Sequence, residues 1–284
     1  MTHLVAMIDG SVHARSVCDA VAWIGRRADA SVDLVHVIDD RAGAGEPVDL
    51  SGNLGLGARS ALLAELAELD AQRAKLAHQK GRLLLEDAQS RLRDLGVEKV
   101  ALKLRRDDLV DAVVELERSA DLLVVGKRGE AADFAKDHLG SNLERVIRST
   151  QTPTVVAPRQ FTPIDAALVA YDGSPMARRA VDWLAAHPSF RELPFTLLMA
   201  GEDDASHRAE LDRAAAQLAE AGFPTEVRVE PGHPVEVIRA ALATERFQLL
   251  VMGAYSHSRF RNLFIGSTTT EIIRTCLATL MLFR

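Results

Sequence analysis

Glycine and hydroxyl residues follow an apolar run near the C-terminus in an order that suits anion binding. The apolar run stops at Gly253, and a polar loop comes after it. The loop leads to a glycine and three hydroxyl residues that open a helical pattern: Gly266, Ser267, Thr268 and Thr269. Glycine lets a backbone approach a phosphate closely. The free N–H groups and the dipole of a helix N-terminus favour negative charge. This order therefore predicts a cradle for a phosphate.

The same order of residues occurs in the N-terminal half. There an apolar run stops at Gly126, and Gly140 and Ser141 open the next helical pattern. An Asp-Gly-Ser triplet also occurs twice, beginning at Asp9 and at Asp172, each time after an apolar run. The repetition indicates two copies of one domain in a single chain.

Short apolar strands alternate with helical patterns, five strands to each half. This alternation predicts parallel sheets with helices on both faces, because right-handed crossovers place the helices there. The expected fold class is α/β, with two flavodoxin-like or Rossmann-like domains at 1–158 and 163–284. Each domain should contain a five-stranded parallel sheet. The first domain carries an insertion at about 41–95.

Ligands of such sheets bind beyond the C-terminal ends of the strands. Asp9 and Asp172 end the first strand of each half, and Gly126 and Gly253 end the fourth. We expect each aspartate to face its glycine across one crevice. An aspartate there accepts hydrogen bonds from an adenine amine or a ribose hydroxyl. The alternative is that it only holds the start of the following helix.

The spacing in the C-terminal half resembles the ATP-binding branch of the universal stress protein family. That branch carries Gly, two residues, Gly, nine residues, Gly, and then Ser or Thr. Gly253, Gly266 and Ser267 match it, and Ser256 stands where the second glycine belongs. The resemblance covers both halves, as in tandem members, and implies an adenine nucleotide as ligand: ATP, with or without Mg²⁺. The site that it implies consists of Asp172, Ala200, Met252, Gly253, Ser256, Gly266, Ser267, Thr268 and Thr269.

The N-terminal half departs from the family pattern in another way. Gly129 keeps the second glycine, but ten residues rather than nine separate it from Gly140. Three acidic residues in that loop would repel a triphosphate. The C-terminal half is therefore the preferred nucleotide site. The less favoured N-terminal site consists of Asp9, Val37, Gly126, Gly129, Gly140 and Ser141.

Other chemistries lack their sequence signals. The chain has no Walker-type phosphate loop, no nucleophile elbow and no His/Cys ligand spacing, so no metal site is predicted. No residue pair is set up for general acid–base catalysis. We expect a binding protein and not an enzyme, although slow ATP hydrolysis would be compatible with this. A net charge of −6 argues against nucleic-acid binding.

The sequence also predicts a cytoplasmic protein. No apolar run approaches the roughly 20 residues that span a membrane, and the N-terminus lacks the pattern of a signal peptide. Cys18 and Cys276, at non-equivalent positions, are interpreted as reduced core residues.

Segment 58–95 is dense in good helix formers, with Gly81 as a candidate break. Its length exceeds the sheet that it must cover, so part of it should protrude or contact a partner protein. The fifth strands, Thr154 to Ala157 and Leu277 to Phe283, are candidate edges. The resemblance implies that such edges pair the two halves, and a homodimer of the whole chain is expected. The alternative function is a scaffold that binds no nucleotide and recruits partners through this segment.

Overall fold

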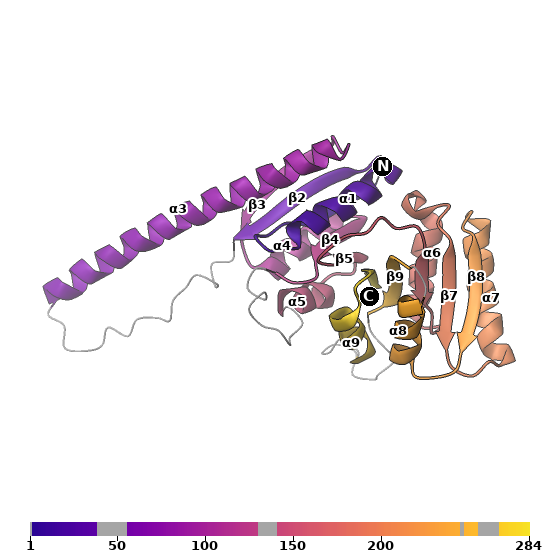
Figure 1. Ribbon diagram of the computed structural model, residues 1–284. Coiled ribbons are helices and arrows are strands. Elements are labelled where there is room, and N and C mark those ends of the chain that lie inside the picture. The colour runs from indigo at the N-terminus through magenta and orange to yellow at the C-terminus, as the bar shows by residue number, and fades with distance from the viewer. Residues whose placement is uncertain (1, 39–55, 130–140, 245–246, 255–266) are drawn as a thin grey trace.

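The computed structural model describes residues 2–38, 56–129, 141–244, 247–254 and 267–284. These residues form ten strands: β1 (His3–Met7), β2 (Ser31–Ile38), β3 (Val100–Arg106), β4 (Leu122–Gly126), β5 (Thr154–Ala157), β6 (Ala167–Ala170), β7 (Phe195–Ala200), β8 (Thr225–Glu230), β9 (Leu249–Gly253) and β10 (Thr279–Phe283). All ten belong to one sheet in the order β3-β2-β1-β4-β5-β10-β9-β6-β7-β8. The two halves of the chain thus share a single sheet (Figure 1).

Within each half, all neighbouring strands run parallel. The α/β class and the five-stranded parallel sheet of each half are therefore confirmed. The halves meet where β5 and β10 pair antiparallel, with Met281 opposite Val155. Fifth strands thus pair with each other inside this chain, as the resemblance implied.

Helices cover both faces of the sheet: α1 (Ala14–Ala28), α3 (Leu56–Asp94), α4 (Leu109–Leu116), α5 (Ser141–Ser149), α6 (Pro175–Ala186), α7 (Ala205–Glu220), α8 (Pro234–Thr244) and α9 (Ser267–Thr275), with short 3-10 helices η1 (Glu117–Ser119) and η3 (Pro188–Phe190). Helices α1, α3, α6 and α7 pack in the core of one face. Helices α4, α5, α8 and α9 pack in the core of the other. Each core contains residues from both halves, so hydrophobic packing joins the halves as the sheet does.

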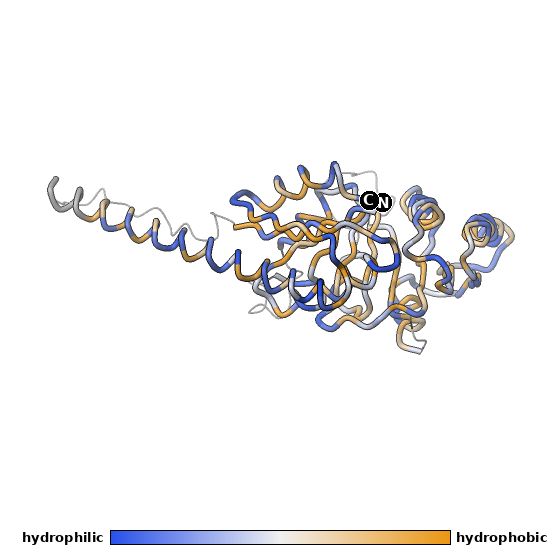
Figure 2. Tube along the Cα trace, turned by 90° about the horizontal axis from the view of Figure 1, so that it is seen from above, coloured by the Kyte–Doolittle hydropathy of each residue, from blue (hydrophilic) through white to orange (hydrophobic). Residues whose placement is uncertain are grey.

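The long helix α3 runs for 39 residues without interruption. The prediction of a break at Gly81 is wrong. Gly81 lies inside the helix and is buried, and a methyl group added there would lie 2.6 Å from His36 Cδ2 and 2.7 Å from Leu104 Cδ1. The glycine therefore lets α3 approach β2 and β3 closely. C-terminal to it, Leu85, Ala88 and Leu92 are buried in the core. The N-terminal part of α3 extends beyond the sheet (Figures 1 and 2).

An aromatic cluster joins the halves on the α1/α6 face. Phe190 of η3 is fully buried, and its ring centroid lies 5.9 Å from that of Trp23 and 6.0 Å from that of Trp183. Arg27 of α1 stacks over Trp23 and donates hydrogen bonds to the carbonyls of Ser189 and Arg191. First-half and second-half residues therefore bury one another at this joint.

Candidate functional site

The aspartates at the ends of β1 and β6 have the same local geometry. Asp9 Oδ1 accepts a hydrogen bond from the Ser11 amide at 3.0 Å, and Asp172 Oδ1 accepts one from the Ser174 amide at 3.0 Å. Both aspartates therefore hold the turn that leads into the next helix. This is the structural role considered as the alternative for Asp172, and one carboxylate oxygen serves it. Asp172 is exposed and Asp9 is half-buried.

The glycines that end β4 and β9 are required by packing. A methyl group on Gly126 would lie 2.8 Å from His13 Cβ, and one on Gly253 would lie 3.0 Å from Met176 Cβ. His13 and Met176 occupy equivalent places, two residues after the serine of each Asp-Gly-Ser triplet. The space beside each glycine is thus occupied by the start of a helix. Gly129 is different, because a methyl group there would lie 3.1 Å from Asp9 Oδ2.

A cavity opens at the C-terminal ends of β1, β2 and β4. Its volume is about 130 Å³. This is comparable with the ~150 Å³ cavities that accept a single benzene ring. It is smaller than the roughly 300–1,000 Å³ of sites that enclose a whole ligand. The cavity therefore has room for part of a ring system, and the rest of a ligand would lie outside it. Twelve residues line it: Met7, Ile8, Asp9, His36, Val37, Leu109, Val125, Gly126, Gly129, Asn142, Leu143 and Val146.

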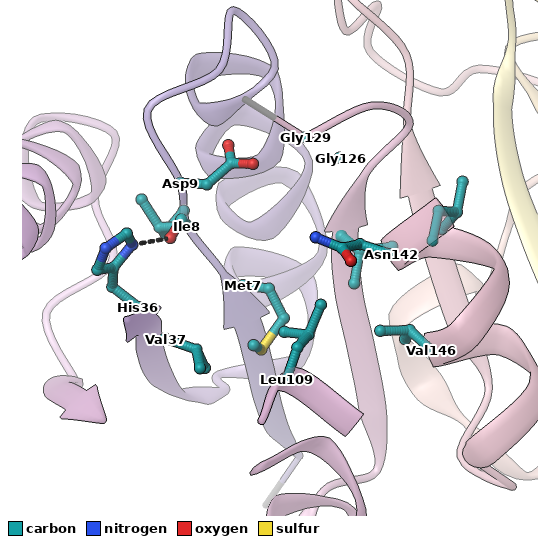
Figure 3. A pocket seen from close by; sticks show the side chains of 12 residues that line it. Met7, Ile8, Asp9, His36, Val37, Leu109, Gly126, Gly129, Asn142 and Val146 are labelled. Carbon is teal, nitrogen blue, oxygen red and sulfur yellow. Dashed lines mark hydrogen bonds between the residues drawn. The ribbon is translucent and has the colours of Figure 1, made fainter. Parts of the chain in front are cut away.

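The cavity has an apolar floor and a polar mouth (Figure 3). Met7, Val37 and Leu109 lie on the floor, while Asp9 and Asn142 lie on opposite sides of the mouth. His36 borders one side, where its Nδ1 lies 2.7 Å from the carbonyl oxygen of Ile8. A flat apolar group fits the floor, and hydrogen-bonding groups fit the mouth. Helix α5 begins beside it, and the free N–H groups of a helix start suit an anion.

The structure brings together four residues of the less favoured N-terminal site. Asp9, Val37, Gly126 and Gly129 all line the cavity. Ser141 is the first residue of α5. Gly140 lies outside the described residues.

Sequence reasoning missed His36 and Asn142. His36 directly precedes Val37, which was predicted, and Asn142 directly follows Ser141. Both therefore lie at strand ends or helix starts that the alternation of elements had already placed. Leu109 was missed as well. It is the first residue of α4, whose N-cap Asp108 accepts a hydrogen bond from the Val110 amide at 2.8 Å.

In the C-terminal half, the predicted residues lie at the equivalent strand ends. Asp172 follows β6, Ala200 ends β7, Met252 and Gly253 end β9, and Ser267 begins α9. Ser256 and Gly266 lie outside the described residues.

Thr268 and Thr269 lie in the first turn of α9. Thr269 is buried, and its hydroxyl donates to the Gly253 carbonyl at 3.4 Å. That hydroxyl therefore joins the helix start to β9. Only the backbone N–H of Thr269 is left for the predicted phosphate contact.

A half-buried lysine, the residue after Gly126, joins the two halves. Lys127 follows Gly126, and its Nζ donates to the Cys276 carbonyl at 2.6 Å, at the end of α9. Burial lowers the pKa of this amine. Its hydrogen bond therefore joins the first half of the chain to the second. Within the described part of the chain, no group of three or more metal-ligating side chains occurs. No described helix is long and apolar enough to cross a membrane.

Each half has the strand order of a doubly wound α/β protein, with first and fourth strands adjacent. The cavity lies where such proteins bind ligands, at the switch point between those strands. This defines the class of protein. A profile of the Universal stress protein family matches residues 1–158 and 188–284.

Similar proteins agree with this match. A universal stress protein of Synechocystis sp. is 37% identical over the full length of both chains. A universal stress protein of Mycolicibacterium smegmatis is 24% identical, covering 93% of this chain and 92% of its own. The crystal structure of a universal stress protein from Archaeoglobus fulgidus has a TM-score of 0.72 at 17% identity, covering 99% of this chain and 98% of its own. The chain belongs to the universal stress protein family, and the two matched segments agree with a tandem arrangement.

Proposed function

We propose that this chain is an adenine-nucleotide-binding regulator of the stress response. Its ligand is ATP, alone or with Mg²⁺, and its role is to bind the nucleotide without turning it over. The protein acts in the cytoplasm. Its two binding units are the domains 1–158 and 163–284, with the insertion at about 41–95 in the first.

The cavity at the ends of β1, β2 and β4 carries the proposal. It suits one end of a nucleotide, because the apolar floor accepts a flat base and the Asp9 carboxylate accepts hydrogen bonds from an amine or a hydroxyl. The start of α5 lies beside the mouth, where phosphates are favoured. Doubly wound sheets bind nucleotides at this place.

The C-terminal half is proposed as the principal site. Asp172 and Gly253 repeat the local geometry of Asp9 and Gly126. The glycine–serine pair that opens α9 keeps the spacing of the family's ATP-binding branch. The N-terminal half keeps its second glycine but has the longer, acidic loop. It is therefore proposed as the weaker of the two sites.

Two variants and a thermal-shift titration with ATP and Mg²⁺ test the proposal. A ligand that binds only the folded chain stabilises it by mass action, by about 2.7 kcal/mol at a hundredfold excess over Kd. Gly266→Val should abolish most of this gain, because the valine side chain blocks backbone approach to phosphate. Asp9→Ala should remove a smaller part. No ATP-dependent gain in the unaltered chain would refute the proposal. An equal loss in both variants would refute the ranking of the sites.

The scaffold alternative rests on a different observation, the exposed leucines of α3. Leu69, Leu76 and Leu83 are 44%, 64% and 66% exposed. Large apolar side chains in such a row mark a contact surface. A scaffold would show no thermal gain with ATP.

A further inference from the structure

Four leucines recur at seven-residue intervals along α3: Leu62, Leu69, Leu76 and Leu83. With about 3.6 residues per turn, this spacing places them on one side of the helix. Leucine at every seventh position is the d position of a coiled-coil heptad. We call these four residues the leucine stripe. Its last three members are 44%, 64% and 66% exposed.

The leucine stripe faces away from the protein's own body. The residues of α3 that are buried against the sheet include Gly81, Leu85 and Leu92, and the heptad places these on the opposite side of the helix. The N-terminal part of α3 also projects past the end of the sheet, and hydrophobic residues recur along it (Figure 2). Within the described part of the chain, three of the four leucines of the stripe are therefore exposed and accessible to a second molecule.

The charges of α3 are divided into two blocks around the stripe. Segment 65–70 contains Glu65, Glu68 and Asp70 and no basic residue. Segment 73–82 contains four basic residues and no acidic one: Arg73, Lys75, Lys80 and Arg82. All seven side chains are exposed. We call these segments the acidic block and the basic block.

This division selects the partner and its direction. Two copies of α3 side by side in parallel would place each block against the same block. Arg73 and Lys80, in the a positions of the heptad, would then face their own copies. An antiparallel pair places the acidic block of each copy beside the basic block of the other, twice over and by one two-fold axis. The attraction between the acidic block of one copy and the basic block of the other then fixes the register of the two helices and also favours their association.

We infer that α3 forms an antiparallel two-stranded coiled coil with α3 of a second copy of this chain, with the leucine stripes at its centre. The stripe spans 62–83, about 33 Å of helix. In a heptad of this kind, basic a-position residues cover leucine with their aliphatic stems and keep their charged ends in water. The sequence predicted a homodimer, and this pairing assigns its surface.

Light scattering on the full chain tests whether the leucine stripe holds the dimer together. The leucine variant carries Leu69→Gln and Leu76→Gln. The matched control carries Ala71→Gln and His78→Gln, at exposed positions on the other side of the same helix. We expect the unaltered chain and the control to be dimers, and the leucine variant to dissociate at least tenfold more readily. A monomeric unaltered chain at its highest soluble concentration would overturn the inference. So would a leucine variant that dimerises as tightly as the control.

Charge reversal tests the direction of the pair. One variant makes the acidic block basic: Glu65→Lys, Glu68→Lys and Asp70→Lys. The other makes the basic block acidic: Arg73→Glu, Lys75→Glu, Lys80→Glu and Arg82→Glu. Alone, each variant should be monomeric, because its arm carries one sign of charge throughout, and an equal mixture should restore the dimer. A parallel pair already has like blocks together, so reversing one block would leave its dimerisation unchanged. That result would overturn the antiparallel pairing.

Discussion

The two oxygens of the Asp9 carboxylate lie beside different groups. Its Oδ1 accepts the Ser11 amide and fixes the turn into α1, while its Oδ2 lies on the side of Gly129. The turn thus orients the carboxylate at the cavity mouth before any ligand arrives, which reduces the ordering cost of binding. Gly126, in contrast, is needed by the fold alone, because the absence of a side chain leaves room for His13. Asp9 therefore fixes a turn with one oxygen and is proposed to meet the ligand with the other, whereas Gly126 serves the fold.

The buried thiol of Cys18 makes the stability of the chain depend on pH. Its thiol is buried in α1, and burial raises its pKa to about 12. The unfolded thiol ionises near 9.0 while the folded one keeps its proton. The contribution of this thiol to the free energy of unfolding is therefore fully present below pH 9. It is lost as pH rises toward 12, by about 1.4 kcal/mol per unit.

Urea unfolding of the unaltered chain and of Cys18→Ala at pH 7 and pH 10 checks this. The variant loses packing at both pH values, so the difference between the two chains isolates the thiol. We expect that difference to shrink by about 1.4 kcal/mol at pH 10. A difference that stays the same at both pH values would contradict the assignment.

At the scale of elements, the apolar runs that stop at Gly126 and Gly253 were enough to place the strands, because buried parallel strands are apolar throughout. The turns at Asp9 and Asp172, and the helix starts that follow them, could then be placed because each comes directly after a strand in the chain. Gly81 was misjudged because local propensity contains no information on His36 and Leu104, which are 45 and 23 residues away in the chain. Asn142 was missed for the related reason that only the fold brings α5 to the ends of β1 and β2. The site residues in loops beyond the described chain stay predictions.

Replacing Gly81 with alanine tests the close packing of α3 against β2 and β3. Alanine is the better helix former by about 1 kcal/mol, but its methyl group would overlap the His36 ring, which is held to the Ile8 carbonyl at 2.7 Å. Overpacking of this kind costs about 1–3 kcal/mol. We expect Gly81→Ala to lower the free energy of unfolding in urea and to weaken ligand binding at the N-terminal cavity. In a His36→Ala background the same change should cost less, and an equal cost in both backgrounds would contradict the contact.

At the scale of the whole molecule, the two halves are joined by the β5–β10 pairing, by both hydrophobic cores and by the cluster around Phe190. Such shared burial makes the halves depend on each other for stability. A ligand that binds in one half would therefore also stabilise the other half. In this tandem chain the two halves share one sheet and two hydrophobic cores, which two separate domains could form only by associating.

Phe190→Ala tests this dependence. The residue is fully buried between Trp23 and Trp183, and the loss of a buried phenylalanine costs about 3–5 kcal/mol. The chain has only these two tryptophans, one in each half, so their fluorescence reports the joint directly. We expect the unaltered chain to unfold in one transition in urea, and Phe190→Ala to lower the midpoint and to separate the unfolding of the two halves. Phe190→Leu should cause a smaller fall. A midpoint unchanged by Phe190→Ala would show that the joint adds no stability.

The binding of an adenine nucleotide at the strand ends is the function proposed for this universal stress protein. Isothermal titration of the purified, nucleotide-free chain with ATP and Mg²⁺ tests it most directly. We expect saturable binding, a principal site that Gly266→Val removes, and a weaker one that Asp9→Ala removes. Absence of binding heat, together with absence of nucleotide in the protein as purified, would contradict the claim and favour a scaffold that acts through α3.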